Sequence, residues 1–394
     1  MSTTNTFSPS YHTKYGSRFL NGIEKGSKIV IAGAGCFGGW TGLLLQEAGF
    51  DVTVVDPWGP GNSRSSSGGE TRLIRCIYGD NELYTKMCMR SFDLWRVYES
   101  KFQQKLLFDL PTWWFCGNDD EFLDPAYDLM DKLQLPYQKL SCEEARKLRP
   151  EINYIDIQNV LVEEMSGYLL AKEGSISVMN YFRKLGGKYI ASACLLEEQG
   201  NKHIEKIQLE NGSGIGCDLF IAACGPWMNK LFPSLNRLFT VTRQEVLYFG
   251  QPPGSFIDFP NWVDGTGSEY FYGLPQGSNR GFKIALDKHG VEIDPTRHER
   301  IPDQDYIHTC REFLGHRFPL LKNAPLIEHR ICQYTNTPDG NFIFDKHPHI
   351  ENCWLLGGGS GHGYKHGPAL GEKVANILTG KEAIEPLFEL SRFQ

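Results

Sequence analysis

The stretch that decides the fold is KIVIAGAGCFGGWTGLLLQEAGFDVTVVD, residues 28–56. It opens on KIVIAG, a short continuous run of apolar and β-branched residues that is typical of a buried parallel strand. A helical stretch follows at 38–49, and DVTVVD at 51–56 is a second strand. A strand, a helix and a strand within about 30 residues predict a βαβ unit.

The turn between the first strand and the helix carries a glycine motif. Its residues are Gly33, Gly35, Cys36, Phe37 and Gly38. Gly33 permits the tight turn, Gly35 lets the backbone approach a pyrophosphate, and Gly38 allows close packing of the helix on the strand. Asp56 closes the second strand, where an acidic side chain bonds a ribose hydroxyl. The motif predicts a dinucleotide site without separating FAD from NAD.

Distant parts of the chain extend the same domain. Two more buried strands are predicted at 217–225 and 352–359, and a helical stretch at 367–380 follows the second. We therefore expect one dinucleotide-binding domain that is discontinuous in sequence. Its expected ranges are 27–110, 150–235 and 325–394.

A different composition separates these parts. Residues 241–249, 268–274 and 281–287 are short aromatic and β-branched segments between Gly, Pro and Asn turns, which favours an antiparallel sheet. Residues 299–319 have a helical pattern. We expect an α/β protein in which a substrate domain with a mixed or antiparallel sheet joins the dinucleotide-binding domain. The substrate domain is expected at 111–149 and 236–324, and a polar tail at 1–26.

Composition narrows the class of protein. The chain has 394 residues, of which 41% are hydrophobic and 22% charged, as in folded soluble enzymes. A net charge of −7 argues against a nucleic-acid partner. No apolar run approaches the roughly 20 residues of a membrane span, and the polar start lacks the apolar centre of a signal peptide. Eleven cysteines without metal-like spacing fit reduced thiols, so we expect a cytoplasmic enzyme without a membrane partner or a metal.

Two loops carry residues suited to ligand chemistry. In GNSRSSSGGETRLIR, 61–75, Arg72 and Arg75 either lie at the surface or turn toward a cofactor ring and a substrate carboxylate. LLGGGSGHGYKHGPALGE, 355–372, places Gly-rich turns before a helix, which suits an anionic ligand. His362 and His366 have no neighbouring acidic or Cys partner, which argues against a metal. Lys365 is either a surface lysine or a carboxylate ligand.

Five stretches, in order along the chain, carry a resemblance to a known family. They are IAGAGCFGGW, SSSGGETRLIRCIYGDNELY, GFKIALD, CQYTNTPDGNFIFDKHP and GSGHGYKHGPALGE. From about residue 28 to 380 the chain resembles the monomeric sarcosine oxidase family, within the D-amino-acid-oxidase-like flavoproteins. The resemblance implies an FAD-binding Rossmann-like domain and a monomer. It also implies oxidation of a secondary or cyclic amino acid, with hydride passing to FAD and dioxygen yielding hydrogen peroxide.

The resemblance assigns roles to single residues. Cys332, just before a Tyr-Thr pair, occupies the family's covalent flavin position; otherwise it is one buried cysteine among eleven. Lys283 matches the lysine that reacts with dioxygen, where a cation stabilises developing negative charge. Arg75 and Lys365 match the pair that binds the substrate carboxylate. Arg72 matches an arginine that packs over the flavin ring, and Tyr272 matches an aromatic residue that lines the substrate cavity. The other residues expected at the cofactor are Ser67, Thr71, Gly359, Gly361, His362, Gly363 and Lys365.

Two departures from the family pattern bear on the substrate. The family's His-His pair is Ser67-Gly68 here, and the His four residues after the lysine is Asp287. Both positions border the substrate, which argues against sarcosine itself. Asp287 favours a substrate with a cation or an N–H donor, acts in proton transfer, or is a strand-end acid bound to a turn. The Trp113-Trp114 pair belongs either to the core or to an aromatic cavity.

The sequence leaves rival functions open. One is oxidation of a cyclic imine or of a larger, possibly aromatic, amino acid in a biosynthetic pathway. Another is an NAD(P)-dependent dehydrogenase with the same glycine motif, and a third is a non-catalytic dinucleotide-binding module. The identity of the amino or imino acid depends on the shape of the cavity, which sequence does not define.

Overall fold

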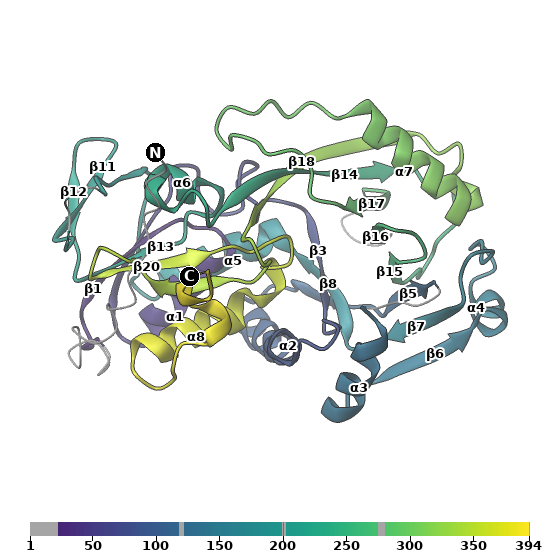
Figure 1. Ribbon diagram of the computed structural model, residues 1–394, viewed down its shortest axis with the longest axis horizontal. Coiled ribbons are helices and arrows are strands. Elements are labelled where there is room, and N and C mark those ends of the chain that lie inside the picture. Colours follow the sequence, from purple (N-terminus) through teal and green to yellow (C-terminus); the bar gives the residue numbers. More distant parts are fainter. Residues whose placement is uncertain (1–22, 118–121, 199, 201, 275–279, 394) are drawn as a thin grey trace, which may run out of the picture.

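The computed structural model describes residues 23–117, 122–198, 200, 202–274 and 280–393 (Figure 1). The polar tail expected at 1–26 therefore lies outside the described residues, apart from its last four. There, the Ile23 N–H donates to the Leu378 carbonyl at 2.9 Å, which ties the start of the described chain to the C-terminal helix.

A six-stranded sheet carries the dinucleotide motif. In spatial order its strands are β19 (Ile343–Lys346), β20 (Cys353–Gly357), β13 (Leu219–Ala222), β1 (Lys28–Ala32), β2 (Asp51–Val55) and β9 (Lys188–Ile190). All neighbours pair in parallel except β19, which is antiparallel to β20. The βαβ unit and the assembly of one sheet from distant segments are both as the sequence predicts.

Both faces of this sheet are buried. Successive side chains along each strand point to opposite sides, so alternate residues pack in different cores. Ile29 and Ile31 pack in the same core as the helices on one face. Val30 and Ala32 pack in a second core on the other face, with β11 and α6. The helices of the first face are α1 (Cys36–Glu47), α2 (Glu82–Phe102), α5 (Ala171–Lys184) and α8 (Gly367–Leu378). The elements near the second are β10 (Cys194–Leu195), β11 (Lys206–Leu209), β12 (Gly214–Gly216) and α6 (Met228–Leu231).

An eight-stranded sheet forms the other large layer (Figure 1). In order, its strands are β18 (Leu326–Asn336), β14 (Thr240–Phe249), β17 (Phe282–Asp287), β16 (Tyr270–Leu274), β15 (Asn261–Asp264), β5 (Thr112–Cys116), β7 (Asn159–Glu163) and β6 (Tyr137–Ser141). Neighbours are antiparallel except β15 and β5, so the sheet is mixed, as expected. Helix α7 (Gln304–Arg317) packs on it through Cys310 and Leu314.

A third, small sheet holds β3 (Thr71–Arg75), β8 (Ser166–Leu170) and β4 (Leu107–Asp109).

Two strands belong to a different sheet from the one that their expected domain implies. β7 and β18 lie in ranges expected for the dinucleotide-binding domain, yet they pair within the eight-stranded sheet. The remaining helices are α3 (Asp124–Leu133) and α4 (Cys142–Leu148). Across the described residues, no helix is both long and apolar enough to cross a membrane.

Candidate active site

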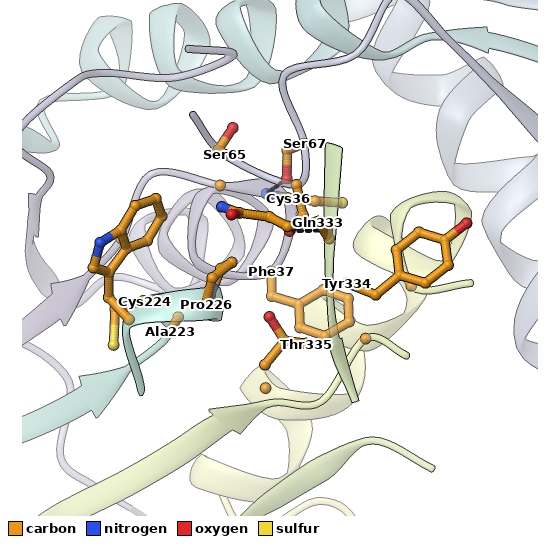
Figure 2. A pocket seen from close by; sticks show the side chains of 18 of the residues that line it. Cys36, Phe37, Ser65, Ser67, Ala223, Cys224, Pro226, Gln333, Tyr334 and Thr335 are labelled. Carbon is orange, nitrogen blue, oxygen red and sulfur yellow. Dashed lines mark hydrogen bonds between the residues drawn. The ribbon is translucent and has the colours of Figure 1, made fainter. Parts of the chain in front are cut away.

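A pocket of about 400 Å³ lies where the two large sheets meet. It begins at the carboxyl ends of β1, β2 and β13, which is where open α/β sheets bind ligands. Figure 2 shows the start of α1, the serines of the 61–75 loop and strand β18 surrounding it. The expected site residues that line it are Gly33, Gly35, Cys36, Phe37, Asp56, Ser67, Arg72, Tyr272, Lys283, Cys332, Gly359, Gly361 and Gly363. The expected residues outside its lining are Gly38, Thr71, Arg75, Asp287, His362 and Lys365.

The glycine motif produces a tight turn into α1. Gly33 has φ of 112°, in the region that glycine enters without a steric penalty, and a Cβ there would lie 2.4 Å from the Ala223 carbonyl oxygen. A Cβ on Gly38 would lie 2.1 Å from the Gly33 carbonyl oxygen. Gly35 precedes α1 without a side-chain cap, and the first turn of α1 holds no acidic residue. The positive end of the helix therefore faces the pocket without a neighbouring carboxylate of its own.

Asp56 holds the turn together from the end of β2. Its carboxylate accepts the N–H groups of Ala34 at 2.9 Å, Trp58 at 2.9 Å and Gly59 at 2.8 Å. Burial raises the pKa of this carboxyl, while these N–H groups act in the opposite direction. A carboxylate has about four lone-pair sites, so a ribose hydroxyl remains a feasible further partner.

Cys332 lies on β18 beside the 61–75 loop. Its sulfur is 3.9 Å from Arg72 Nη2, and that guanidinium also donates to the carbonyls of Ser66 at 2.8 Å and Thr71 at 2.9 Å. The structure thus brings together two residues that are 260 positions apart and that the sequence assigns to the flavin.

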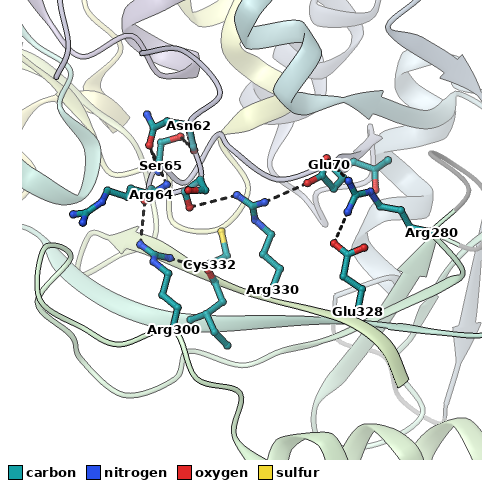
Figure 3. A network of polar contacts seen from close by, with 12 residues as sticks. Asn62, Arg64, Ser65, Glu70, Arg280, Arg300, Glu328, Arg330 and Cys332 are labelled. Atoms are coloured by element: carbon teal, nitrogen blue, oxygen red, sulfur yellow. Dashed lines mark hydrogen bonds and ion pairs between the residues drawn. The ribbon is translucent and has the colours of Figure 1, made fainter. Parts of the chain in front are cut away.

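A network of arginines and glutamates fastens this loop to β18 (Figure 3). Arg300 donates to the Ile331 carbonyl at 2.8 Å and to the Arg64 carbonyl at 3.3 Å. Arg330 donates to Glu70 at 3.3 Å. These bonds hold the 61–75 loop against the strand that carries Cys332.

Lys283 enters the pocket from β17. It is 3% exposed, and its ammonium donates to the Thr71 carbonyl at 3.0 Å and the Thr71 hydroxyl at 3.3 Å. Burial and the nearby Arg72 lower the pKa of Lys283 to about 7. Thr71 thus bonds to Lys283 and lies outside the pocket lining. Tyr272 lies nearby, and burial raises its pKa to about 12.

Arg75 and Lys365 converge on one aromatic ring outside the main pocket. The Arg75 guanidinium carbon is 4.8 Å from the ring centre of Tyr78, and Lys365 Nζ is 5.0 Å from the same centre. Lys365 is 5% exposed and donates to the His362 carbonyl at 3.1 Å. Burial, then Arg75, lower the pKa of Lys365 to about 7. The surface interpretation of both residues is wrong, because the fold buries Lys365 and faces Arg75 with aromatic rings.

The two histidines bond to Tyr78. Its hydroxyl lies 3.2 Å from His362 Nδ1 and 2.7 Å from His366 Nε2. His362 Nε2 lies 3.1 Å from the Gly340 carbonyl, to which it donates, so Nδ1 accepts from Tyr78. His362 thus bonds to Tyr78 and lies outside the pocket lining. Among the described residues, no group of three or more His, Cys, Asp or Glu side chains could hold a metal ion.

The side chains of Trp113 and Trp114 lie on opposite faces of β5 and pack in different cores. Trp113 packs in the core of the eight-stranded sheet. Trp114 points to the opposite face, where Arg75 lies 5.2 Å from its ring centre. Asp287 is exposed at the end of β17, beside Tyr270 in the strand register, and acts electrostatically on Tyr272.

Several residues at the site are absent from those that the sequence predicts, although Tyr78 and Tyr334 lie within the quoted motifs. Trp58 and Trp227 line the pocket with ring centres 4.6 Å apart. Tyr334 lines it next to Cys332 and hydrogen-bonds to Tyr272. Tyr78 follows Arg75 by three positions. Because β3 ends at Arg75, the chain can turn and bring the Tyr78 ring under the guanidinium, a contact that the spacing alone does not predict.

These features define a class: a dinucleotide-binding α/β enzyme whose pocket lies between a Rossmann-like sheet and a mixed sheet. The glycine-lined wall and the start of α1, where the Cys36 N–H donates to the Ser67 hydroxyl at 2.9 Å and the first turn has no acidic residue, fit the phosphates of FAD. The sequence pattern of the FAD dependent oxidoreductase family matches residues 28–377, and the chain belongs to that family. The match favours FAD over NAD(P) and an enzyme over a non-catalytic module.

Curated relatives confirm the resemblance to monomeric sarcosine oxidases. The chain is 28% identical to monomeric sarcosine oxidase of Bacillus sp. (strain B-0618), over 90% of this chain and 92% of the relative. It is 27% identical to N-methyl-L-tryptophan oxidase of Salmonella dublin, with 93% and 98% covered. Human peroxisomal sarcosine oxidase is 27% identical, with 92% and 95% covered.

Solved structures share the fold. L-proline dehydrogenase from P. horikoshii superimposes with a TM-score of 0.81 at 20% identity, covering 94% of this chain and 98% of the other. Fructosamine oxidase from Aspergillus fumigatus gives 0.79 at 19% identity, covering 93% and 90%. The FAD-binding and mixed-sheet architecture expected from the sequence is confirmed.

Proposed function

We propose that the protein oxidises a secondary or cyclic amino acid, such as an N-methyl amino acid or an imino acid, with FAD attached covalently to Cys332. Hydrogen peroxide is the second product. The observation that carries the proposal is the pair of cations, Arg75 and Lys365, that meet at the Tyr78 ring. The names of the curated relatives, which include sarcosine and N-methyl-L-tryptophan, support the same class.

The cation pair is suited to a carboxylate. Each cation makes one hydrogen bond to a carbonyl group, Arg75 to Ile77 and Lys365 to His362. A substrate carboxylate between them gains charge-assisted hydrogen bonds. Its negative charge also raises the pKa of Lys365 and keeps the ammonium charged. The substrate's amine and reacting carbon then lie toward the pocket that Tyr272 and Lys283 line.

The cofactor side of the pocket has matching groups. FAD, when bound, supplies the hydride acceptor and the electrons for dioxygen. Arg72 and Lys283 place two cations beside the Cys332 sulfur, where they stabilise negative charge. Ser67 and the glycines of the motif hold the turn at which the phosphates bind.

A larger or aromatic amino acid is the second candidate, and aromatic rings around Arg75 favour it. Arg75 lies 5.2 Å from the ring centre of Trp114 and 5.9 Å from that of Phe122. Phe122 in turn lies 6.2 Å from Tyr270. Asp287, beside Tyr270, supplies an anion for an N–H donor or a cation on the substrate.

We also propose a monomer in the cytoplasm, with a small amino or imino acid and dioxygen as its partners. None of the eleven cysteines, all of which lie in the described residues, forms a disulfide, which supports a reducing compartment. We further propose the two domains with the residue ranges given above, except that β7 and β18 pair in the sheet of the substrate domain.

The test is a screen for peroxide release. The panel pairs sarcosine with N-methyl-L-tryptophan, and L-proline with L-pipecolate, each beside its amide. We expect release with at least one free acid and far less with its amide. Release that is equal for acid and amide, or absent across the panel while the protein carries FAD, contradicts the proposal.

A further inference from the structure

Glu163 is a buried acid that the proposed reaction does not use. It ends β7 and is 2% exposed. One carboxylate oxygen accepts the N–H groups of Cys76 and of Ile77, the latter at 3.1 Å. The other accepts the indole N–H of Trp114 at 2.9 Å. Burying a carboxylate is costly, so a site that keeps one needs a compensating charge.

The compensating charges are the two cations of the carboxylate site. Cys76 and Ile77, whose N–H groups Glu163 binds, directly follow Arg75 in the chain. Trp114, its third donor, is also the ring over which the Arg75 guanidinium lies. Burial raises the pKa of Glu163, and Arg75 lowers it. Glu163 in turn acts to raise the pKa of Lys365.

We infer that Glu163 is a positioning residue and the built-in counter-ion of the carboxylate site: it fixes the backbone that aims Arg75 and supplies a buried negative charge to the site that holds the two cations. This inference rests on the proposed function, in which Arg75 and Lys365 bind the substrate carboxylate. One buried carboxylate and two cations leave the site with one positive charge in excess, which the carboxylate of the substrate balances.

Lys365 is surrounded by few other charges. The titratable groups around it are Arg75 from β3, Cys76 and Tyr78 just after that strand, Cys88 from α2, Glu163 from β7, Asp287 from β17, and its chain neighbours His362 and His366. Burial lowers the pKa of His362 to about 3 and that of His366 well below its usual range, so both are neutral at pH 7. Asp287 is exposed and screened by solvent. Cys88 donates its S–H to the Arg75 carbonyl at 2.7 Å. Glu163 is thus the buried carboxylate among the groups that raise the pKa of Lys365.

The experiment titrates the holoenzyme with acetate, an inert carboxylate, from pH 5.5 to 8.5. Calorimetry measures affinity and proton uptake, and the flavin spectrum reports occupancy. In the wild type, affinity falls above about pH 7, where Lys365 loses its proton. Glu163→Gln shifts this midpoint down on the order of one pH unit, which weakens acetate about eightfold at pH 7.5 and less than twofold at pH 5.5.

Controls separate this inference from a folding defect. Glu164→Gln removes a neighbouring exposed charge and keeps the wild-type midpoint. In Glu163→Gln, the amide N–H groups would meet the indole N–H of Trp114, two donors without an acceptor. The substitution is therefore repeated in a Trp114→Phe background, which removes the indole donor. Trp114→Phe alone is the control that keeps the Glu163 carboxylate. An equal loss of affinity at every pH, or an unchanged midpoint in both backgrounds, overturns the counter-ion role.

The same titration tests the proposed function separately. Arg75→Ala and Lys365→Met each weaken acetate at pH 6 if the carboxylate binds there, and Lys365→Met also removes the pH dependence. If both variants weaken acetate while Glu163→Gln keeps the wild-type midpoint, only the inference about Glu163 fails. If neither variant weakens acetate, the carboxylate site itself is misplaced.

Discussion

Lys283→Met removes a buried cation from the pocket. Lys283 is 3% exposed, and its ammonium donates to neutral oxygens of Thr71; in the part of the chain that the structure describes, no carboxylate forms an ion pair with it. Reduction of dioxygen creates negative charge, and a fixed ammonium stabilises that charge as it forms. Losing about 3–4 kcal/mol of such stabilisation slows the step on the order of a few hundredfold. Substrate oxidation, which needs a neutral amine and an oriented carbon–hydrogen bond, should change far less.

The depressed pKa adds a second signature. Since Lys283 has a pKa of about 7, roughly nine-tenths of it is charged at pH 6 and one-tenth at pH 8. The wild-type reaction with dioxygen should therefore slow about tenfold over this range, while Lys283→Met stays slow and independent of pH.

Stopped-flow absorbance follows the two half-reactions separately. Anaerobic mixing with substrate gives the rate of flavin reduction, and mixing the reduced enzyme with dioxygen gives the rate of reoxidation. Lys288→Met, which removes an exposed lysine paired with Glu269, is the matched control and should behave as wild type. If reoxidation is untouched in Lys283→Met while reduction collapses, Lys283 belongs to the substrate site and the dioxygen assignment is wrong.

Three further changes test other parts of the site. Cys332→Ser should leave a folded protein that releases its flavin on denaturation and oxidises substrate more slowly; a fluorescent flavin band on a denaturing gel of this variant would place the attachment elsewhere. Arg75→Ala should weaken an amino acid about 10- to 100-fold, from the loss of about 1.5–3 kcal/mol, and weaken its amide far less, as inhibition constants will show. Gly33→Ala places a Cβ 2.4 Å from the Ala223 carbonyl oxygen at a φ of 112°, so FAD content should fall sharply, measured by absorbance against protein concentration. Gly212→Ala also has a positive φ but no atom within 4 Å, and it should retain FAD.

Elements defined by local patterns were predictable. The segments expected at 241–249, 268–274 and 281–287 correspond to β14, β16 and β17, because alternation and turn residues act over a few positions. The strands β5, β6 and β7 were not anticipated. β7 is NVLVE, a short apolar run that periodicity cannot distinguish from a buried helix segment. Nothing in the run indicates to which of the two domains it belongs.

The sequence by itself determined the βαβ unit, the glycine turn and the residues that match the flavoprotein motifs, since these depend on neighbours in the chain. Only the tertiary structure decided that Arg75 and Lys365, 290 positions apart, meet at Tyr78, that Trp113 and Trp114 serve different cores, and that Glu163 accepts the N–H groups of Ile77 and Trp114. Such contacts depend on which strands pair and on which face each side chain emerges, and a shift of one residue reverses the face. The charge balance of the site is therefore a property of the folded sheets rather than of any motif.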